Sequence, residues 1–317
     1  MSDEIIPTDQ KRRKRTSNLH LNARWRTAIV PLLLLAPALI LLIIFRYIPT
    51  LSAVFHSFTI WNILFPEEFV GLKNYQDLLQ DSVFLQSLRN ILQYAIMRTL
   101  LTMTMAFVGA ELVYNIHNAR WRNIWRLVFT IPMVIPLTVE LMIWKEIYAG
   151  RQGLLNEFLV AIGVLDRAYP WLGRPDTALW ALIFVGFPAV AGFGFLVLLA
   201  ALQNLPSEVN EAALLDGCSR LQCVFAIDLP NIRGPLALIL ILSLNSGLQQ
   251  FAPMLVMTNG GPANTTMSPA FYLYWEAFKY GKQGYASAIG VILLLMTLGL
   301  SILILWSRYR SASDVTA

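Results

Sequence analysis

The sequence predicts an all-α membrane protein with six transmembrane helices. Hydrophobic residues make up 56% of the 317 residues and charged residues only 14%, and the mean hydropathy is +0.57. A soluble domain carries about a quarter charged residues, so this composition favours the bilayer. Runs of about 18 or more mostly apolar residues are long enough to cross it as helices. Six such runs occur, at about 29–48, 90–114, 126–149, 178–203, 234–257 and 285–306.

The chain begins with a basic tail, residues 1–28, and the first predicted span follows at 29–48. This apolar run is longer than the apolar core of a typical signal peptide and contains Pro31 and Pro37. It also lacks a clear cleavage site of small residues before Arg46. We therefore expect the run to remain in the protein as a transmembrane helix.

After the first span, residues 49–88 are predicted to form an external segment, in which 76–84 has the pattern of a helix lying on the membrane surface. Residues 89–307 form a core of five spans, interrupted by a polar loop at 204–233. A short tail, 308–317, ends the chain. Pro132 and Pro136 lie within the third span and each removes a backbone donor, so kinks are expected there.

Basic residues are concentrated on one side of the predicted spans. If both termini lie on that side, it holds the cluster Lys11–Arg15 and the arginines that flank the first three spans, whereas the other side holds fewer basic residues. An excess of Lys and Arg marks the cytoplasmic side, so both termini are predicted to be cytoplasmic. The net charge of +5 then indicates orientation and contact with lipid headgroups, not nucleic-acid binding.

The polar loop contains the pattern E-A-A-x-x-x-G, followed by nine residues and then I-x-L-P. Its composition predicts a helix that ends at Gly217, because glycine tolerates the left-handed conformation after a helix. A second short helix, about 219–226, is expected to end before Pro230. The loop resembles the cytoplasmic coupling loop (EAA loop) of permease subunits in binding-protein-dependent ABC importers. The matching positions are Glu211, Ala212, Ala213, Gly217, Ile227, Leu229 and Pro230.

Two further segments resemble the sugar-type branch of these permeases, the group that includes maltose, glycerol-phosphate and lactose permeases. One is F-V-G-L-K-N-Y at 69–75, and the other is T-N-G-G-P at 258–262. The resemblance implies the fold of a type I ABC importer permease. It also implies four kinds of partner: a second homologous permease, two ATP-binding subunits, an external solute-binding protein and a carbohydrate substrate. A role in docking the binding protein is expected for Asn259, Gly260, Gly261 and Pro262.

Polar residues in the fifth span suggest a substrate path. Ser243, Ser246, Gly247 and Gln250 recur at three- and four-residue spacing and share one helix face. Buried hydroxyls and amides cost free energy unless they are paired. These residues are therefore expected either to line a water-filled cavity or to form hydrogen bonds to a neighbouring helix. The span resembles the cargo-contacting region of maltose-type permeases, although Ser246 and Gly247 stand where an aromatic residue and an amide would be. The resemblance implies a substrate path that comprises Ser243, Asn245, Ser246, Gln249 and Gln250.

Two ionisable residues, Arg98 and Glu140, lie within predicted spans. If the second and third spans run antiparallel, both residues lie about ten residues from the outer ends, at a similar depth. An intramembrane ion pair would lower the cost of each charge. Contact with an acidic or polyhydroxyl cargo and extension of each side chain towards the interface are the alternatives.

The sequence gives no evidence for catalytic chemistry. The three histidines are scattered, no cluster of metal ligands or nucleophile and base is visible, and no P-loop pattern occurs. We therefore expect no enzyme activity and no cofactor or metal in this chain, with ATP and Mg²⁺ bound by partner subunits. Cys218 and Cys223 are expected to be unpaired, because the cytoplasm is reducing.

The sequence therefore predicts an importer permease in a bacterial or archaeal cytoplasmic membrane. Alternating access would carry a carbohydrate through it, with an oligosaccharide as the first expectation. An acidic saccharide and a glycerol phosphodiester are alternative cargoes. A self-contained secondary carrier or channel is a competing class, and a membrane-embedded enzyme would need a polar cluster that the sequence lacks.

Overall fold

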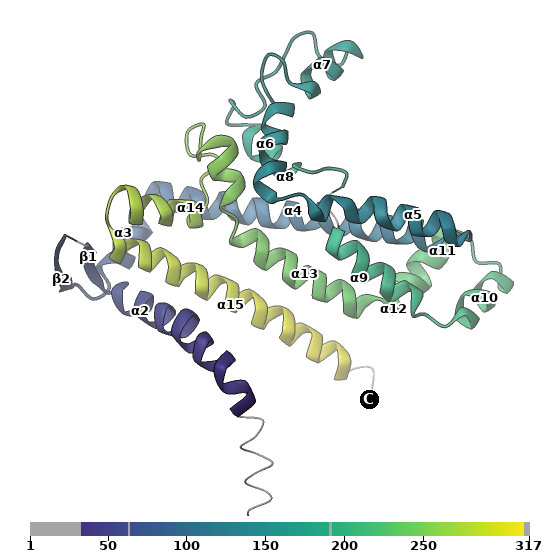
Figure 1. The fold of residues 1–317 in the computed structure, drawn as a ribbon, viewed down its shortest axis with the longest axis horizontal. Coiled ribbons are helices and arrows are strands. Elements are labelled where there is room, and N and C mark those ends of the chain that lie inside the picture. The colour runs from purple at the N-terminus through teal and green to yellow at the C-terminus, as the bar shows by residue number, and fades with distance from the viewer. Residues whose placement is uncertain (1–32, 63, 190–191, 314–317) are drawn as a thin grey trace, which may run out of the picture. The chain divides into compact units, whose positions relative to one another are not determined.

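A computed structural model describes residues 33–62, 64–189 and 192–313, and this part of the chain is mostly helical (Figure 1). The described residues divide into two units, with the boundary between residues 55 and 56. The predicted N-terminal tail, 1–28, lies outside the described residues. The described part of the first unit belongs to one apolar helix, Leu33–His56, which includes a π-helical turn, η1 (Ile43–Tyr47), and then α2 (Ile48–His56). This helix extends beyond residue 48, where the first span was predicted to end.

The second unit begins with a small hairpin and a short helix, within the segment 49–88 that was predicted to be external with a surface helix. Strands β1 (Thr59–Asn62) and β2 (Phe65–Phe69) pair antiparallel, and α3 (Lys73–Gln80) follows. The buried Asn74 amide donates hydrogen bonds to the carbonyl oxygens of Ser57 and Thr59, at 2.9 Å each. These bonds fix α3 against the hairpin.

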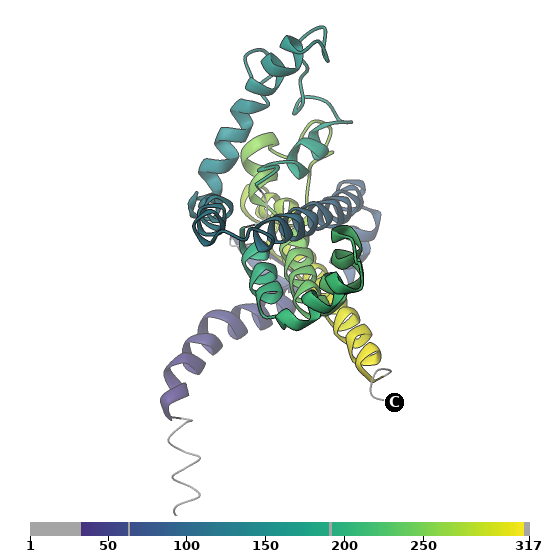
Figure 2. The ribbon, with the colours of Figure 1, turned by 90° about the vertical axis from the view of Figure 1, so that its right-hand side faces the viewer.

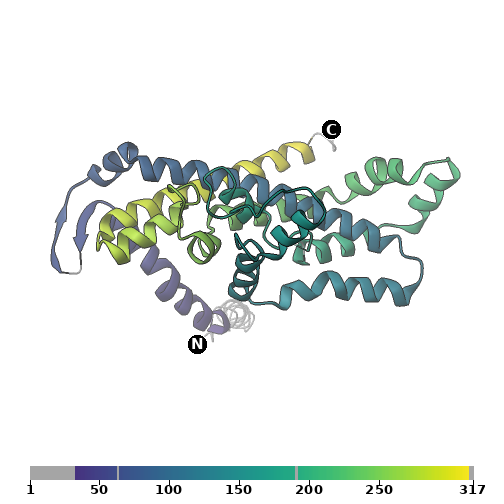
Figure 3. The same cartoon turned by 90° about the horizontal axis from the view of Figure 1, so that it is seen from above.

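The long helix α4 (Ser82–Tyr114) is the axis of the second unit, because α5, α9 and α13 all pack against it (Figures 1 and 3). Small residues allow the closest approaches. A side chain at Gly247 of α13 would meet the Cα of Ala95 at 2.9 Å, and one at Gly194 of α9 would meet the Cβ of Ala106 at 3.2 Å. Small residues at helix interfaces are typical of membrane proteins, in which backbone proximity increases van der Waals contact.

Several of the other apolar runs form broken helices. Helix α5 (Ala119–Thr130) and the 3₁₀ turn η2 (Ile131–Val134) are followed after a 93° bend by α6 (Leu137–Ile147), which confirms the break expected at the two prolines. Figures 2 and 3 show α5 returning beside α4, and α6 leading away to α7 (Leu154–Ala161). The fourth run is split into α8 (Ala178–Ile183) and α9 (Gly192–Gln203).

The polar loop consists of α10 (Ser207–Leu215), α11 (Arg220–Cys223), the π-helical turn η3 (Val224–Asp228) and α12 (Leu229–Asn231). Helix α13 (Arg233–Leu248) follows, and then η4 (Met254–Thr258), α14 (Pro269–Tyr274), η5 (Trp275–Lys279) and the long α15 (Gln283–Ser313). By length and composition, three helices in the described residues could cross a membrane, or up to five if each bent pair counts as one span.

The start of α4 is tied to the C-terminal part of the chain through Asp81. Its carboxylate accepts hydrogen bonds from the backbone N–H groups of Val83 and Phe84, so it caps the helix. The same side chain accepts bonds from the Tyr272 and Tyr285 hydroxyls at 2.6 and 2.7 Å. One carboxylate therefore joins α4, α14 and α15.

Candidate functional site: a polar pocket and a coupling loop

A pocket of about 320 Å³ lies where α4, α9 and α13 meet, and it collects three of the five residues predicted for the substrate path. Ser243, Ser246 and Gln250 line it, together with Gly247. These positions lie on one helical face, as the sequence spacing indicated. The described residues that line it are Tyr94, Arg98, Thr99, Thr102, Phe193, Leu242, Ser243, Ser246, Gly247 and Gln250.

The other two residues predicted for the path lie outside this pocket. The Asn245 amide donates a hydrogen bond to the Ser301 hydroxyl of α15 at 3.1 Å. Gln249 follows the last residue of α13 and is exposed. Asn245 therefore forms an interhelical hydrogen bond, which was one of the two alternatives for these polar residues, and does not line the pocket.

Arg98 also lines the pocket, but it does not pair with Glu140. Its Nη1 donates hydrogen bonds to the carbonyl oxygens of Ile183 and Val185, and the ion pairs among the described residues include neither Arg98 nor Glu140. The ion-pair prediction assumed that the second and third spans run antiparallel, whereas α6 turns away from α5 by 93°. Helix α8 ends at Ile183 and leaves carbonyl groups without helical partners, and Arg98 caps them.

Sequence reasoning missed the contribution of α4 to this pocket. Tyr94, Arg98 and Thr102 recur every four residues and therefore share one face of α4, with Thr99 beside them. The Thr99 side chain is buried and its hydroxyl oxygen has no hydrogen-bond partner. A stripe of hydroxyl groups around an intramembrane arginine was the signal that could have identified this wall.

The coupling loop is helical over most of its length. Gly217, which follows α10, has φ +79°, so the turn requires the left-handed conformation that was predicted there. Ser219 and Gln222 form a capping box at the start of α11. Contrary to the expectation that the second helix would end before Pro230, helical structure continues to Asn231. The π-helical turn η3 runs without a break into α12, so Pro230 lies within a helix and its missing N–H removes one helical hydrogen bond there.

Much of the motif is accessible to a partner. Glu211, Ala212, Gly217 and Pro230 are exposed, Ile227 and Leu229 are half-buried, and Ala213 is buried. Three apolar side chains beside the motif are also exposed, to 89%, 72% and 65%: Leu215, Leu221 and Phe225. Such an exposed apolar group is typical of a surface that another protein covers.

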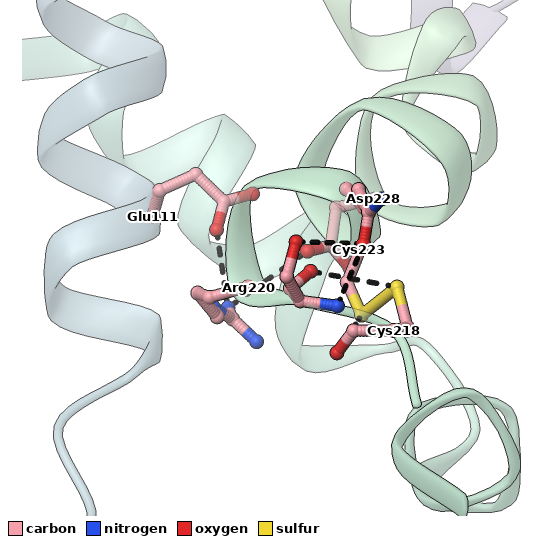
Figure 4. Close-up of a disulfide and its surroundings, with 7 residues drawn as sticks. Glu111, Cys218, Arg220, Cys223 and Asp228 are labelled. Atoms are coloured by element: carbon pink, nitrogen blue, oxygen red, sulfur yellow. Dashed lines mark hydrogen bonds and ion pairs between the residues drawn. A yellow bond between two sulfur atoms is a disulfide. The ribbon is translucent and has the colours of Figure 1, made fainter. Parts of the chain in front are cut away.

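Arg220 joins the second half of the loop to the end of α4 (Figure 4). Its guanidinium lies 3.3 Å from a carboxylate oxygen of Glu111 and 3.8 Å from one of Asp228. Both acidic residues are buried, so each needs the positive charge between them. The sequence analysis did not single out this cluster, because its members are separated by up to 117 residues.

Cys218 and Cys223 form a disulfide beside this cluster (Figure 4). The expectation that both cysteines are unpaired was therefore wrong. The turn between α10 and α11 brings their Cα atoms to 5.9 Å, which lies within the usual range for a disulfide.

The turn predicted to dock a binding protein is mostly occupied by contacts within the chain. Asn259 is exposed, but Gly260 is buried and Gly261 and Pro262 are half-buried. The Thr266 hydroxyl donates a hydrogen bond to the Gly261 carbonyl at 2.8 Å. Of these four residues, Asn259 therefore offers the most accessible side chain.

The chain belongs to the family of inner membrane components of binding-protein-dependent transport systems, whose model matches residues 99–313. It is thus a permease subunit of an ABC importer and a transport component, not an enzyme.

Relatives and solved structures agree with this assignment. A probable ABC transporter permease, YurN of Bacillus subtilis, is 35% identical and covers 87% of this chain and 94% of its own length. The diacetylchitobiose uptake permease NgcF of Streptomyces coelicolor is 32% identical over 82% of this chain and 76% of its own. The fold matches a chain of a bacterial ABC transporter involved in the import of the acidic polysaccharide alginate. That match has a TM-score of 0.79 at 20% identity, and it covers 93% of this chain and 99% of the other.

Proposed function

We propose that this subunit carries an oligosaccharide across the cytoplasmic membrane of a bacterium or archaeon by alternating access. The observation that carries the proposal is the meeting of Ser243, Ser246 and Gln250 with the polar face of α4 in one pocket. Hydroxyl and amide groups suit the hydroxyl-rich surface of a sugar, since each can donate or accept hydrogen bonds. The permeases NgcF and MsmF are named for diacetylchitobiose uptake and for transport of multiple sugars.

The remaining half of the translocation path belongs, in this proposal, to a second homologous permease. The core would contain five spans after the first helix, making six in total with both termini cytoplasmic. Two ATP-binding subunits would bind ATP and Mg²⁺ and close against the coupling loop. The exposed Glu211 and the apolar side chains of Leu215 and Phe225 support that contact, because a carboxylate can pair with a basic partner beside an apolar surface.

An external binding protein would deliver the sugar, with Asn259 as the accessible residue of the turn at 258–262. Alternating access then requires only that the closing motion of the ATP-binding subunits favours an inward-open state over an outward-open one. The chain itself supplies no covalent step.

Two alternatives remain distinct from this proposal. A glycerol phosphodiester would use the same importer with a different cargo, whereas an acidic saccharide would be a narrower class within the proposed cargo. A self-contained secondary carrier or channel would transport its substrate without any ATPase.

The test is purification of the chain from its native membrane, followed by uptake in vesicles rebuilt from what co-purifies. We expect an ATPase and a second permease to co-purify, and labelled oligosaccharide to accumulate only with ATP and the binding protein. Glu211→Lys should release the ATPase. The same charge reversal at the exposed Glu157 of α7, far along the chain from the motif, should not. Transport by this chain alone and without ATP would establish the carrier or channel instead.

A further inference from the structure

Arg98 brings a positive charge into the pocket. It is the only charged residue among the described residues that line it. No ion pair within 4.0 Å involves it in the part of the chain that the structure describes. An arginine at membrane depth is costly unless it is paired or serves a function. If Arg98 served only to cap the carbonyl groups at the end of α8, it would not also need to line a pocket of polar side chains.

The hydrogen bonds of Arg98 leave one edge of its guanidinium available. A guanidinium has five N–H donors, and Nη1 supplies two of them. Both bonds from Nη1 go to backbone carbonyls, of Ile183 and Val185. Nε and Nη2 have no hydrogen bond to any described residue. These two nitrogens form the edge that binds a carboxylate or phosphate through two parallel hydrogen bonds.

A second polar group in the same wall also lacks a partner. Thr99, the residue next to Arg98, is 2% exposed, and its hydroxyl oxygen is buried without a hydrogen bond. Buried polar atoms are normally paired, so the unpaired hydroxyl shows that the chain leaves a polar group of this wall unsatisfied. The hydroxyl and the free guanidinium edge lie on consecutive residues of α4.

We propose that this pocket binds the anionic group of an acidic oligosaccharide, with Arg98 as the residue that selects it. The inference rests on the proposed function and specifies its substrate class. Arg98 contacts the carboxylate of a uronic acid or the phosphate of a sugar phosphate through Nε and Nη2. Ser243, Ser246 and Gln250 bind hydroxyl groups of the same cargo. The contact with the carbonyls after α8 holds the guanidinium in place for this interaction.

The test uses the intact complex in vesicles, supplied with its binding protein and a labelled pool of oligosaccharides. The pool contains uronate-bearing oligosaccharides, phosphate-bearing ones and the carboxyl-reduced neutral partner of each uronate. We expect at least one anionic class to accumulate about tenfold or more over its neutral partner, as expected from one charged hydrogen-bonding contact. Which anionic class accumulates distinguishes a carboxylate cargo from a phosphate cargo.

Two variants assign this preference to Arg98. Arg98→Gln should abolish the preference for anionic members of the pool. If this variant fails to assemble because the carbonyls after α8 lose their cap, Thr102→Glu provides an independent measurement. It places a carboxylate four residues from Arg98 on the same helix face, where it neutralises the guanidinium. Thr102→Gln, which has similar size and no charge, is the matched comparison: both variants change the pocket wall equally in bulk, and Thr102→Glu should lower the preference further than Thr102→Gln does.

The outcomes separate the two levels of the proposal. ATP-dependent accumulation of neutral members in preference to anionic ones, or a preference that survives both Arg98→Gln and Thr102→Glu, overturns the role of Arg98 and leaves the importer standing. If no saccharide of any class accumulates with ATP, the proposed function itself fails.

Discussion

Gly217 shows how one residue sets the geometry of the coupling loop. Its φ of +79° is a left-handed conformation, and no atom lies within 4 Å of where a side chain would begin. The backbone conformation therefore favours glycine at this position, although there is room for a side chain. We predict that Gly217→Val costs about 1–2 kcal/mol in this turn and changes the angle between α10 and α11. Substrate-stimulated ATPase activity should fall while the subunits still co-purify.

The matched control is Gly217→Asn, because asparagine enters the left-handed region at little cost. It should retain most of the stimulated ATPase activity. Full stimulation of the Gly217→Val variant would show that the turn does not transmit motion.

Asp81 gives a prediction on pH. Its burial favours the neutral form, but hydrogen bonds from Tyr272, Tyr285 and two backbone N–H groups outweigh this and hold its pKa below the usual 3.8. The folded state therefore binds the proton more weakly than the unfolded state. The resulting stabilisation is fully present above about pH 4 and is lost as the pH falls through the folded-state pKa.

We accordingly predict that Asp81→Asn lowers the unfolding free energy at neutral pH by about 2 kcal/mol, as for the loss of hydrogen bonds to a charged group. The difference in Tm between the variant and the natural protein should shrink on acidification below pH 4. Asp77→Asn, an exposed acidic residue on the preceding helix, is the control and should change little at any pH. A constant Tm difference across the pH range would contradict this account.

At the scale of elements, the packing of α13 on α4 depends on Gly247. A methyl group there would lie 2.9 Å from the Cα of Ala95, closer than real contacts allow. Gly247→Ala should therefore destabilise the protein by about 1–3 kcal/mol, even though alanine favours helix. Gly299 of α15 has open space around it, so Gly299→Ala should stabilise by up to about 1 kcal/mol. Thermal unfolding of the two variants checks the opposite signs.

The link between α11 and α4 through Arg220 gives the second prediction at this scale. Arg220→Gln leaves Glu111 and Asp228 buried without the charge that faces both. We expect lower thermal stability and weaker ATPase stimulation by cargo. Arg220→Lys keeps the charge and should restore part of both properties. Unchanged stimulation in Arg220→Gln would show that motion reaches the spans by another route, such as the bend between α12 and α13.

From the sequence, the positions of the long helices could be predicted better than the points at which other helices are broken. Hydropathy reports the length of an apolar run, and so α4 and α15 were expected at nearly their observed positions. Prolines signalled the bend before α6. The separation of α8 from α9 had a signal of the same kind in Pro188, which the sequence analysis did not use. Hydropathy alone does not reveal which carbonyl groups lose their helical partners. Arg98 therefore seemed to need Glu140, although the broken helix supplies its partners.

At the scale of the whole molecule, the number of spans decides how the coupling loop and the pocket are oriented. The described residues include three helices long enough to cross a membrane, and two bent pairs raise this to five if each pair crosses. The split run α8–α9 is the remaining candidate of the six predicted. A bent pair that re-enters on one side would place the segments flanking it on the same face of the membrane.

Single cysteines between successive runs distinguish these cases, in a background in which Cys218 and Cys223 are serine. The test positions are Asn118, Arg167, Asp216 and Ala263, which flank in turn the bent pair α5–α6, the split run α8–α9 and the bent pair that leads into α13. Six spans predict that an impermeant maleimide labels Arg167→Cys and Ala263→Cys in intact cells. Asn118→Cys and Asp216→Cys should be labelled only after permeabilisation.

Each adjacent pair of these positions flanks one apolar run. The labelling therefore identifies which run fails to cross the membrane. Equal labelling of Asn118→Cys and Arg167→Cys in intact cells would show that α5 and α6 re-enter on one side. Equal labelling of Arg167→Cys and Asp216→Cys would show the same for α8 and α9, and would place the coupling loop on the outer face. Because an ATP-binding subunit reaches only the inner face, that result would exclude the contact proposed for Glu211.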